Sequence, residues 1–119
     1  MAAANALDGE AVGRLALQGY SGAVAAALEL AHWLGRGLVG ITNTFNPEMI
    51  VVGGGVADLD ELVLAPAREY LQKTAMAPNK DEVRVVRAAL GNTAGIVGAG
   101  LAALETCGAS ASSNRPDRP

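Results

Sequence analysis

The apolar positions of the chain follow two different patterns on either side of Pro47. Between residues 22 and 45, apolar and small residues recur every three or four positions, which predicts one long helix with a single apolar stripe. The stripe consists of Val24, Leu28, Ala31, Leu34 or Gly35, Leu38, Ile41 or Thr42, and Phe45. Residues 49–52 are instead continuously apolar, which is typical of a buried strand in a parallel sheet. Pro47 separates the two patterns because a proline disfavours the helical conformation in the residue before it.

The rest of the pattern predicts an α/β order of helix, strand, helix, strand, helix. The other predicted elements are a helix at 10–18 with Asp8 as N-cap and Gly19 as its stop, a short helix at 59–64, a further helix starting at Pro66, a strand at 82–90, and a helix from Ala94 to about Glu105 capped by Asn92 or Thr93. Strands joined through a helix in this way are expected to be parallel neighbours.

Two strands make a poor sheet, so we expect the chain to be the end of a larger one. A buried-type strand needs neighbours on both sides, and two-stranded pairs are only marginally stable. An unpaired strand edge also favours self-association. We expect residues 1–9 to be frayed, residues 10–105 to be the ordered part of a lobe, and the Ser/Pro/Arg-rich residues 106–119 to be a disordered tail.

Three consecutive glycines, Gly53 to Gly55, follow the first predicted strand. A turn at the carboxyl end of a parallel strand lies where α/β proteins bind ligands, and its backbone N–H groups can meet phosphate or ribose oxygens. A tight turn without a ligand explains the glycines equally well. The phosphate-binding P-loop is excluded because no Lys-Ser/Thr pair follows, and the dinucleotide fingerprint is excluded because Asp58 stands where it requires glycine.

Other glycines lie inside predicted helices, where they are interpreted as small packing positions. Gly35, Gly37 and Gly40 have the spacing of the dinucleotide fingerprint, but no strand precedes them. Gly95 and Gly98 give the last helix a small face against which another backbone could pack. Such a face would also suit a hinge between two lobes.

Composition excludes several classes of function. The formal net charge is −3 and no Lys/Arg cluster is interleaved with aromatic residues, so a nucleic-acid surface is not expected. With His32 and Cys107 as the only histidine and cysteine, the chain can form neither an internal disulfide nor a Cys/His metal site, which fits a reducing cytosol. The first residues lack the pattern of a signal peptide, and the uninterrupted apolar runs are too short to cross a bilayer.

No residue is identified as a nucleophile or general base, so no catalytic residue is predicted. His32, next to Trp33, is interpreted as a solvated or satisfied side chain because no partner residues accompany it. Asp58, Asp60 and Glu61 are interpreted as acids that favour the N-terminal end of a helix dipole.

Two segments together resemble the C-terminal part of the ROK family, which groups bacterial sugar kinases and repressors. These are "FNPEMIVVGGGV", residues 45–56, and "LGNTAGIVGA", residues 90–99, with "ELVLAPAREYL" between them. The resemblance extends over roughly residues 9–105 and is strongest to glucokinase-like members. It implies the actin-like, ribonuclease-H-like fold of hexokinases, in which each lobe ends with the element order predicted above.

The resemblance also implies site residues and substrates. Gly53, Gly54, Gly55 and Val56 match the turn that contacts the adenosine of ATP, which such kinases use with Mg²⁺ to convert a hexose to its 6-phosphate. The segment with Gly91, Asn92, Gly95 and Gly98 matches the part that packs at the hinge between lobes.

Other parts of the family pattern are missing from this sequence. They are the N-terminal phosphate loop, the catalytic aspartate, the sugar-binding residues and the zinc cluster. We therefore expect a truncated or excised segment of a cytoplasmic kinase that is inactive without the N-terminal portion. The same segment of a sugar-responsive repressor, and a degenerate remnant that binds nothing, are the alternatives.

Overall fold

The computed structural model describes the backbone of residues 8–112 and the side chains of residues 8–108. Its elements are α1 (Gly9–Leu17), α2 (Ser21–Phe45), β1 (Met49–Val52), the 3₁₀ helix η1 (Gly55–Leu59), α3 (Glu61–Thr74), α4 (Asn79–Glu82), β2 (Arg84–Arg87), the 3₁₀ helix η2 (Gly91–Thr93) and α5 (Ala94–Ser112). The predicted order of helices and strands is confirmed, with η1, α4 and η2 as additional short elements.

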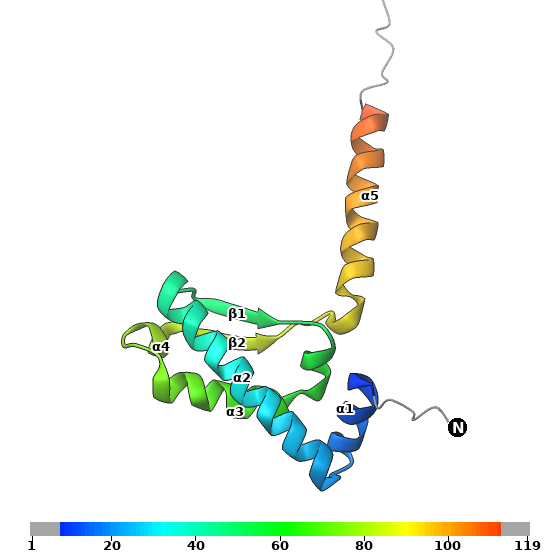
Figure 1. Cartoon of the computed structure of the whole chain (residues 1–119). Helices are drawn as coiled ribbons and strands as arrows, with labels where there is room; N and C mark the ends of the chain where they lie inside the picture. Colours follow the sequence, from blue (N-terminus) through cyan, green and yellow to red (C-terminus); the bar gives the residue numbers. More distant parts are fainter. Residues whose placement is uncertain (1–7, 113–119) are drawn as a thin grey trace, which may run out of the picture.

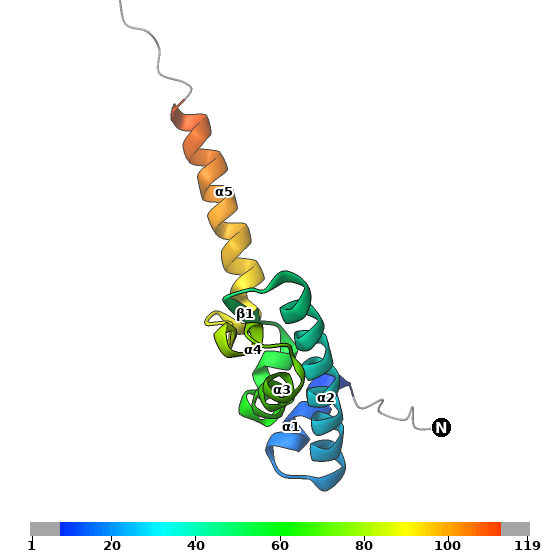
Figure 2. The same ribbon diagram turned by 90° about the vertical axis from the view of Figure 1, so that its left-hand side faces the viewer.

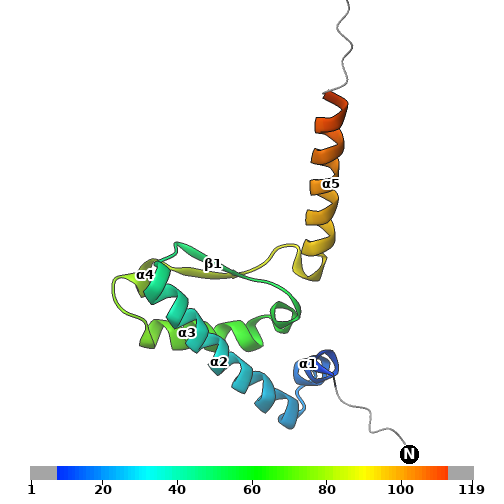
Figure 3. The same cartoon turned by 45° about the horizontal axis from the view of Figure 1, so that its top comes forward.

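Strands β1 and β2 pair in parallel, as predicted, and form one layer of the structure. Their register runs from Met49 opposite Arg84 to Val52 opposite Arg87. The second layer consists of α2 and α3, which lie against the same face of the sheet (Figures 1 and 3). The core between the layers is built from Leu38, Ala67, Leu71, Ala75, Val83 and Val85, with Ile50 and Val52 packed against it.

A second apolar cluster holds α1 against the first half of α2. Ala16 of α1, Ala27 and Ala31 of α2, and Val63 of α3 are all buried in it. Asp8 is the N-cap of α1, as predicted, because its carboxylate accepts a 2.7 Å hydrogen bond from the backbone N–H of Ala11. This packing places α1 beside η1, on the far side of the molecule from α4 (Figure 1).

The strand at 49–52 is buried on one face only, whereas its apolar sequence predicted burial on both. Ile50 and Val52 are half-buried under the helices, but Met49 and Val51 are 41% and 57% exposed. Within residues 8–112, no element covers the face of the sheet that carries these two side chains. The continuous apolar sequence is therefore typical of a strand covered on both faces, whereas the described residues cover only one face.

The predicted break at Pro66 is wrong, because α3 continues through it. Pro66 lacks the N–H that would bond to the preceding turn, yet the helix holds on both sides of it. Val63 and Leu64 before it and Ala67 and Leu71 after it are buried against α1, α2 and the sheet. Tertiary packing thus outweighs the local cost of the proline.

Two other predicted boundaries need correction. The second strand is shorter than 82–90, because Glu82 ends α4 and the chain turns after Arg87. The helix from Ala94 runs to Ser112, so residues 106–112 are helical rather than part of a disordered tail. Asp8 and Gly9, predicted to belong to a frayed N-terminus, instead cap and begin α1. Residues 1–7 and 113–119, the rest of the predicted frayed and disordered ends, lie outside the described residues.

Helix α5 projects away from the two layers (Figures 1 and 2). Every side chain described between residues 92 and 108 is exposed. The large apolar side chains among them include Ile96, Leu101 and Leu104, which are 78%, 58% and 70% exposed.

Helix α2 is the one described helix whose length and composition would allow it to cross a membrane, although no uninterrupted apolar run is that long. Core helices of soluble proteins meet the same criterion. Ala31 and Leu38 on the inner face of α2 are buried within the protein.

Candidate functional site

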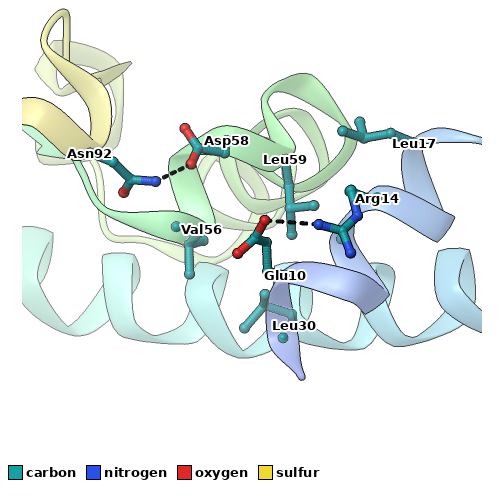
Figure 4. A pocket seen from close by; sticks show the side chains of 11 residues that line it. Glu10, Arg14, Leu17, Leu30, Val56, Asp58, Leu59 and Asn92 are labelled. Atoms are coloured by element: carbon teal, nitrogen blue, oxygen red, sulfur yellow. Dashed lines mark hydrogen bonds and ion pairs between the residues drawn. The ribbon is translucent and has the colours of Figure 1, made fainter. Parts of the chain in front are cut away.

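A pocket of about 680 Å³ lies between α1, η1 and η2, next to the glycine turn (Figure 4). Its lining combines apolar and polar side chains from four parts of the chain. The lining residues are Gly9, Glu10, Gly13, Arg14 and Leu17 of α1, Leu30 of α2, Gly55, Val56, Asp58 and Leu59 of η1, and Asn92 of η2. The pocket volume is within the range of small-molecule sites.

Only two of the four predicted nucleotide-binding residues of the glycine turn line this pocket. Gly55 and Val56 line the pocket, whereas Gly53 and Gly54 do not. A Cβ on Gly53 would lie 3.6 Å from the Cβ of Ala88, so Gly53 is in ordinary contact with the chain after β2. The structure therefore separates Gly53 and Gly54, at the end of the strand, from the pocket wall.

Gly54 and Gly55 are glycines for different reasons. Gly54 has φ 75° and ψ −168°, a conformation that is essentially restricted to glycine, so the turn alone requires glycine there. Gly55 has no positive φ, and, apart from its chain neighbours and the backbone of η1, no described atom lies within 4 Å of a Cβ built on it. Neither backbone strain nor a neighbour within the described residues explains the missing side chain of Gly55.

Helix α1 forms the opposite wall, which sequence reasoning missed. Arg14 and Glu10 form a 2.8 Å ion pair one helical turn apart (Figure 4). A Cβ on Gly13 would lie 3.0 Å from Cδ2 of Leu59, so α1 approaches η1 closely at this glycine. The sequence did contain a signal for this close approach, because Gly13 is a glycine in the middle of a segment predicted to be helical.

Asp58 links the glycine turn to the residues before α5. Its Oδ2 accepts a 2.5 Å hydrogen bond from Nδ2 of Asn92, and its Oδ1 lies 3.3 Å from Nη2 of Arg87. Arg87 also approaches Asp60, with 3.8 Å between Nη1 and Oδ1. Asp58 lies in the first turn of η1, as the helix-dipole interpretation requires, and its carboxylate is in addition bonded to Asn92 of η2 (Figure 4) and to Arg87 of β2.

The neighbouring acids also have specific partners. Glu61 accepts two hydrogen bonds from Nη1 of Arg68, whose Nε donates to the backbone carbonyl of Val85 at 2.8 Å. Glu61 thus helps to attach α3 to β2. Asp60, with φ 48°, occupies the junction between η1 and α3.

The predicted hinge residues fall into two groups. Gly91, with φ 52°, makes the turn into η2, and Asn92 reaches the pocket rather than capping α5. Thr93 donates from Oγ1 to the carbonyl of Leu90 at 2.6 Å. Gly95 and Gly98 lie on exposed α5, where, apart from the adjoining turns of α5 itself, no described atom is within 4 Å of a built Cβ. Their predicted role as a packing face stays a prediction.

The helical glycines of α2 also differ from one another. Gly35 is a buried packing position, as predicted. Gly37 and Gly40 are exposed, and a Cβ on either would meet nothing within 4 Å in the described part of the chain. The match to the dinucleotide fingerprint lies within a helix, as the sequence indicated.

Neither a catalytic group nor a metal site is assembled by residues 8–112. No three His, Cys, Asp or Glu side chains come together there in a way that could hold a metal ion. His32 is exposed and makes edge contacts with the rings of Trp33 and Tyr70 at centroid distances of 5.8 and 5.0 Å. The pocket carboxylates, Glu10 and Asp58, are both paired with other side chains, so we assign no Mg²⁺ ligand to them.

Comparison with known proteins identifies the family. The sequence model of the ROK family matches residues 2–106, which is most of the chain. The chain belongs to the ROK family. Both segments that carried the resemblance, at the glycine turn and at the start of α5, lie within this match.

Curated ROK relatives include a kinase and a repressor. The glucokinase of Streptomyces coelicolor is 39% identical over 94 residues, which is 78% of this chain and 30% of that protein. A putative xylose repressor of a Caldicellulosiruptor species is 31% identical over 83 residues, covering 70% of this chain and 21% of the repressor. The chain therefore spans less than a third of the length of these relatives.

A solved ROK structure supports the same fold. The crystal structure of a ROK family glucokinase from Streptomyces griseus, in complex with glucose and AMPPNP, matches with a TM-score of 0.65 and 38% identity. The match covers 76% of this chain and 29% of the glucokinase. The described helices and the two-stranded parallel sheet thus have the arrangement found in ROK sugar kinases, which have the actin-like ATPase fold.

Proposed function

We propose that this ROK chain is the C-terminal, adenosine-binding segment of an ATP-dependent hexose kinase of the glucokinase type. The observation that carries the proposal is the open pocket beside Gly55, a glycine that neither backbone strain nor a described neighbour requires. A flat base can approach a backbone that lacks a Cβ. The similarity to glucokinases, one of them solved with AMPPNP, supports ATP as the occupant.

The pocket offers suitable groups for a nucleoside. Val56, Leu59 and Leu17 provide apolar surface for the base, and Asn92 and Arg14, each paired with a pocket carboxylate, carry further N–H donors. In this role the chain binds and orients the nucleotide, while ATP supplies the phosphoryl group that a hexose would accept. Positioning of this kind is the main contribution of a protein to phosphoryl transfer.

The chain alone is not expected to phosphorylate glucose. Its sequence contains neither the phosphate loop nor the catalytic aspartate of the family, and we propose that the N-terminal portion of the kinase supplies both. Mg²⁺ would enter with the nucleotide, and zinc has no site in the described residues. We place the complete enzyme in the cytoplasm, consistent with the single cysteine of this chain.

Calorimetric titration of the full chain with MgATP tests the proposal. We expect measurable binding, and we expect Gly55→Val to weaken it at least tenfold because the new side chain occupies the pocket wall. The matched control is Gly98→Val on exposed α5, which adds the same side chain at a residue that does not line the pocket. Equal weakening by both variants, or no binding by the wild-type chain, would contradict the proposal.

A second candidate function is the same segment of a sugar-responsive transcriptional repressor. The identity to a putative xylose repressor over 70% of this chain favours it. Reading the gene in frame upstream of Met1 separates the two candidates. A phosphate loop followed by a cysteine-rich zinc motif indicates the kinase, and a winged helix-turn-helix ahead of the loop indicates the repressor.

A further inference from the structure

We propose that Asp58 is a positioning residue that couples the pocket wall η1 to the base of α5. This coupling lies within the chain itself, and only the measurement of MgATP affinity described below rests on the function proposed above. Asp58 lies in η1, one residue from the wall residue Leu59, and its carboxylate accepts a hydrogen bond from Asn92 in η2.

The Asp58–Asn92 hydrogen bond matters for α5 because few other contacts connect this helix to the rest of the described chain. All described side chains between residues 92 and 108 are exposed. Across the described part of the chain, this is the one side-chain hydrogen bond that joins η2 or α5 to the elements before β2. The direction in which α5 leaves the core therefore depends on η2 and on this bond.

The carboxylate is also held on its other side. Arg87, the last residue of β2, lies 3.3 Å from Oδ1 of Asp58, while Asn92 occupies Oδ2. A carboxylate with both oxygens engaged has a defined orientation, and a charged acceptor makes the stronger kind of hydrogen bond. Movement of η1 on ligand binding would therefore be transmitted to Asn92 and η2, and movement of α5 to the pocket wall.

Backbone amides on both sides of the link provide the measurement. The N–H of Ala57 bonds to the carbonyl of Gly54 in η1, and the N–H of Thr93 bonds to the carbonyl of Leu90 in η2. Amide hydrogen exchange reports how often each of these bonds opens. Coupling predicts that loss of the Asn92 side chain raises exchange in η1 as well as in η2.

The experiment is residue-resolved hydrogen exchange on the full chain without nucleotide. We expect Asn92→Ala to raise exchange at Ala57 about fivefold, as for the loss of one hydrogen bond. Asn92→Asp opposes two carboxylates and should have at least the same effect. The exchanged pair, Asp58→Asn with Asn92→Asp, restores a donor and an acceptor and should return exchange at Ala57 toward the wild-type rate.

The control is Glu69→Ala, which breaks an exposed ion pair with Lys73 on α3, away from the pocket. It should leave exchange at Ala57 unchanged. Coupling is overturned if Asn92→Ala raises exchange only around η2, or if the exchanged pair is as perturbed as Asn92→Asp alone.

A second arm measures MgATP affinity by calorimetry, where Asn92→Ala should raise the Kd about fivefold and the exchanged pair should restore it. An unchanged Kd in Asn92→Ala would count against the coupling. If the wild-type chain bound no MgATP, the proposed function would fail, and the exchange result alone would still decide whether Asp58 couples η1 to η2.

Discussion

Gly35 of α2 lies directly against Tyr70 of α3. A Cβ built on Gly35 would be 2.9 Å from the Cβ of Tyr70 and 3.1 Å from its Cγ and Cδ1. Because the nearest of these atoms is attached directly to the backbone of α3, rotation of the tyrosine ring cannot relieve the contact. The closeness of the two helices, and with it the core beneath them, therefore depends on this glycine.

The first prediction is that Gly35→Ala destabilises the chain. Overpacking of a close contact costs about 1–3 kcal/mol, whereas replacing a helical glycine by alanine gains about 0.5–1 kcal/mol. We expect the free energy of unfolding to fall by roughly 1 kcal/mol from the balance of these two effects. Urea unfolding followed by circular dichroism measures it.

Gly37→Ala is the matched control, two residues along the same helix. Gly37 is exposed and has no described neighbour within 4 Å of a built Cβ, so only the gain in helix propensity applies. This variant should be more stable than the wild type by about 0.5–1 kcal/mol. Stabilisation of both variants would show that α2 and α3 are not held this closely in solution.

The second prediction separates strain from ligand contact in the glycine turn. Gly54→Ala should lower the free energy of unfolding by about 1–3 kcal/mol, because φ 75° with ψ −168° is strained for any residue with a Cβ. Gly55→Ala should leave stability nearly unchanged, since Gly55 has neither a positive φ nor a described neighbour. Similar losses in the two variants would contradict the assignment of strain to Gly54.

Local sequence patterns were sufficient for much of the fold. The three-to-four spacing in α2, the apolar run of β1 and the capping residue Asp8 each act over a few residues, and the elements that they predict are confirmed. The predicted stripe of α2 is only partly buried, because Leu28 and Phe45 are 47% and 74% exposed. The strand order also followed from the rule that a helical connection joins parallel neighbours. Where the prediction was wrong, at Pro66, buried neighbours on α3 decided the outcome, and no local pattern shows which residues will be buried.

The candidate site was less accessible from sequence. Gly55 was identified because it follows a strand, and Val56 because it matches the family's nucleotide-contacting turn. The opposite wall comes from Glu10, Gly13 and Arg14, more than 40 residues away in the sequence. Asp58 was interpreted through its own helix, whereas its partners Arg87 and Asn92 come from β2 and η2. Pairings of this range depend on the tertiary fold.

The third prediction concerns Thr42, a buried polar residue of α2. Its side chain is fully buried, and Oγ1 has no hydrogen-bond partner among the described residues. Burying an unpaired hydroxyl costs about 1–3 kcal/mol, so Thr42→Val should raise the free energy of unfolding by about 1 kcal/mol.

Thr44→Val is the control for Thr42→Val, because Thr44 is exposed and its hydroxyl can reach water. Chemical unfolding should show a change near zero for this variant. An equal gain in both would indicate a general preference of α2 for valine, and a loss in Thr42→Val would indicate that the hydroxyl does have a partner.

The last prediction is that the chain associates with copies of itself through α5 and the uncovered face of the sheet. Val97, Leu101 and Leu104 are all exposed and are spaced four and three residues apart, so they form one apolar stripe on α5. On the sheet, Val51 is 57% exposed beside an unpaired strand edge. Exposed apolar side chains clustered on one face of an element mark association sites.

Sedimentation velocity over a concentration series measures this association. Leu101→Glu should lower the average mass at a given concentration, because it places a charge in the middle of the α5 stripe. Ala102→Glu adds the same charge at the adjoining exposed position, which points away from that stripe, and should have a smaller effect. Val51→Glu tests the sheet face in the same way. A wild-type chain that stayed monomeric at every concentration would refute the prediction, and equal effects of Leu101→Glu and Ala102→Glu would show that net charge, rather than the stripe, controls the association.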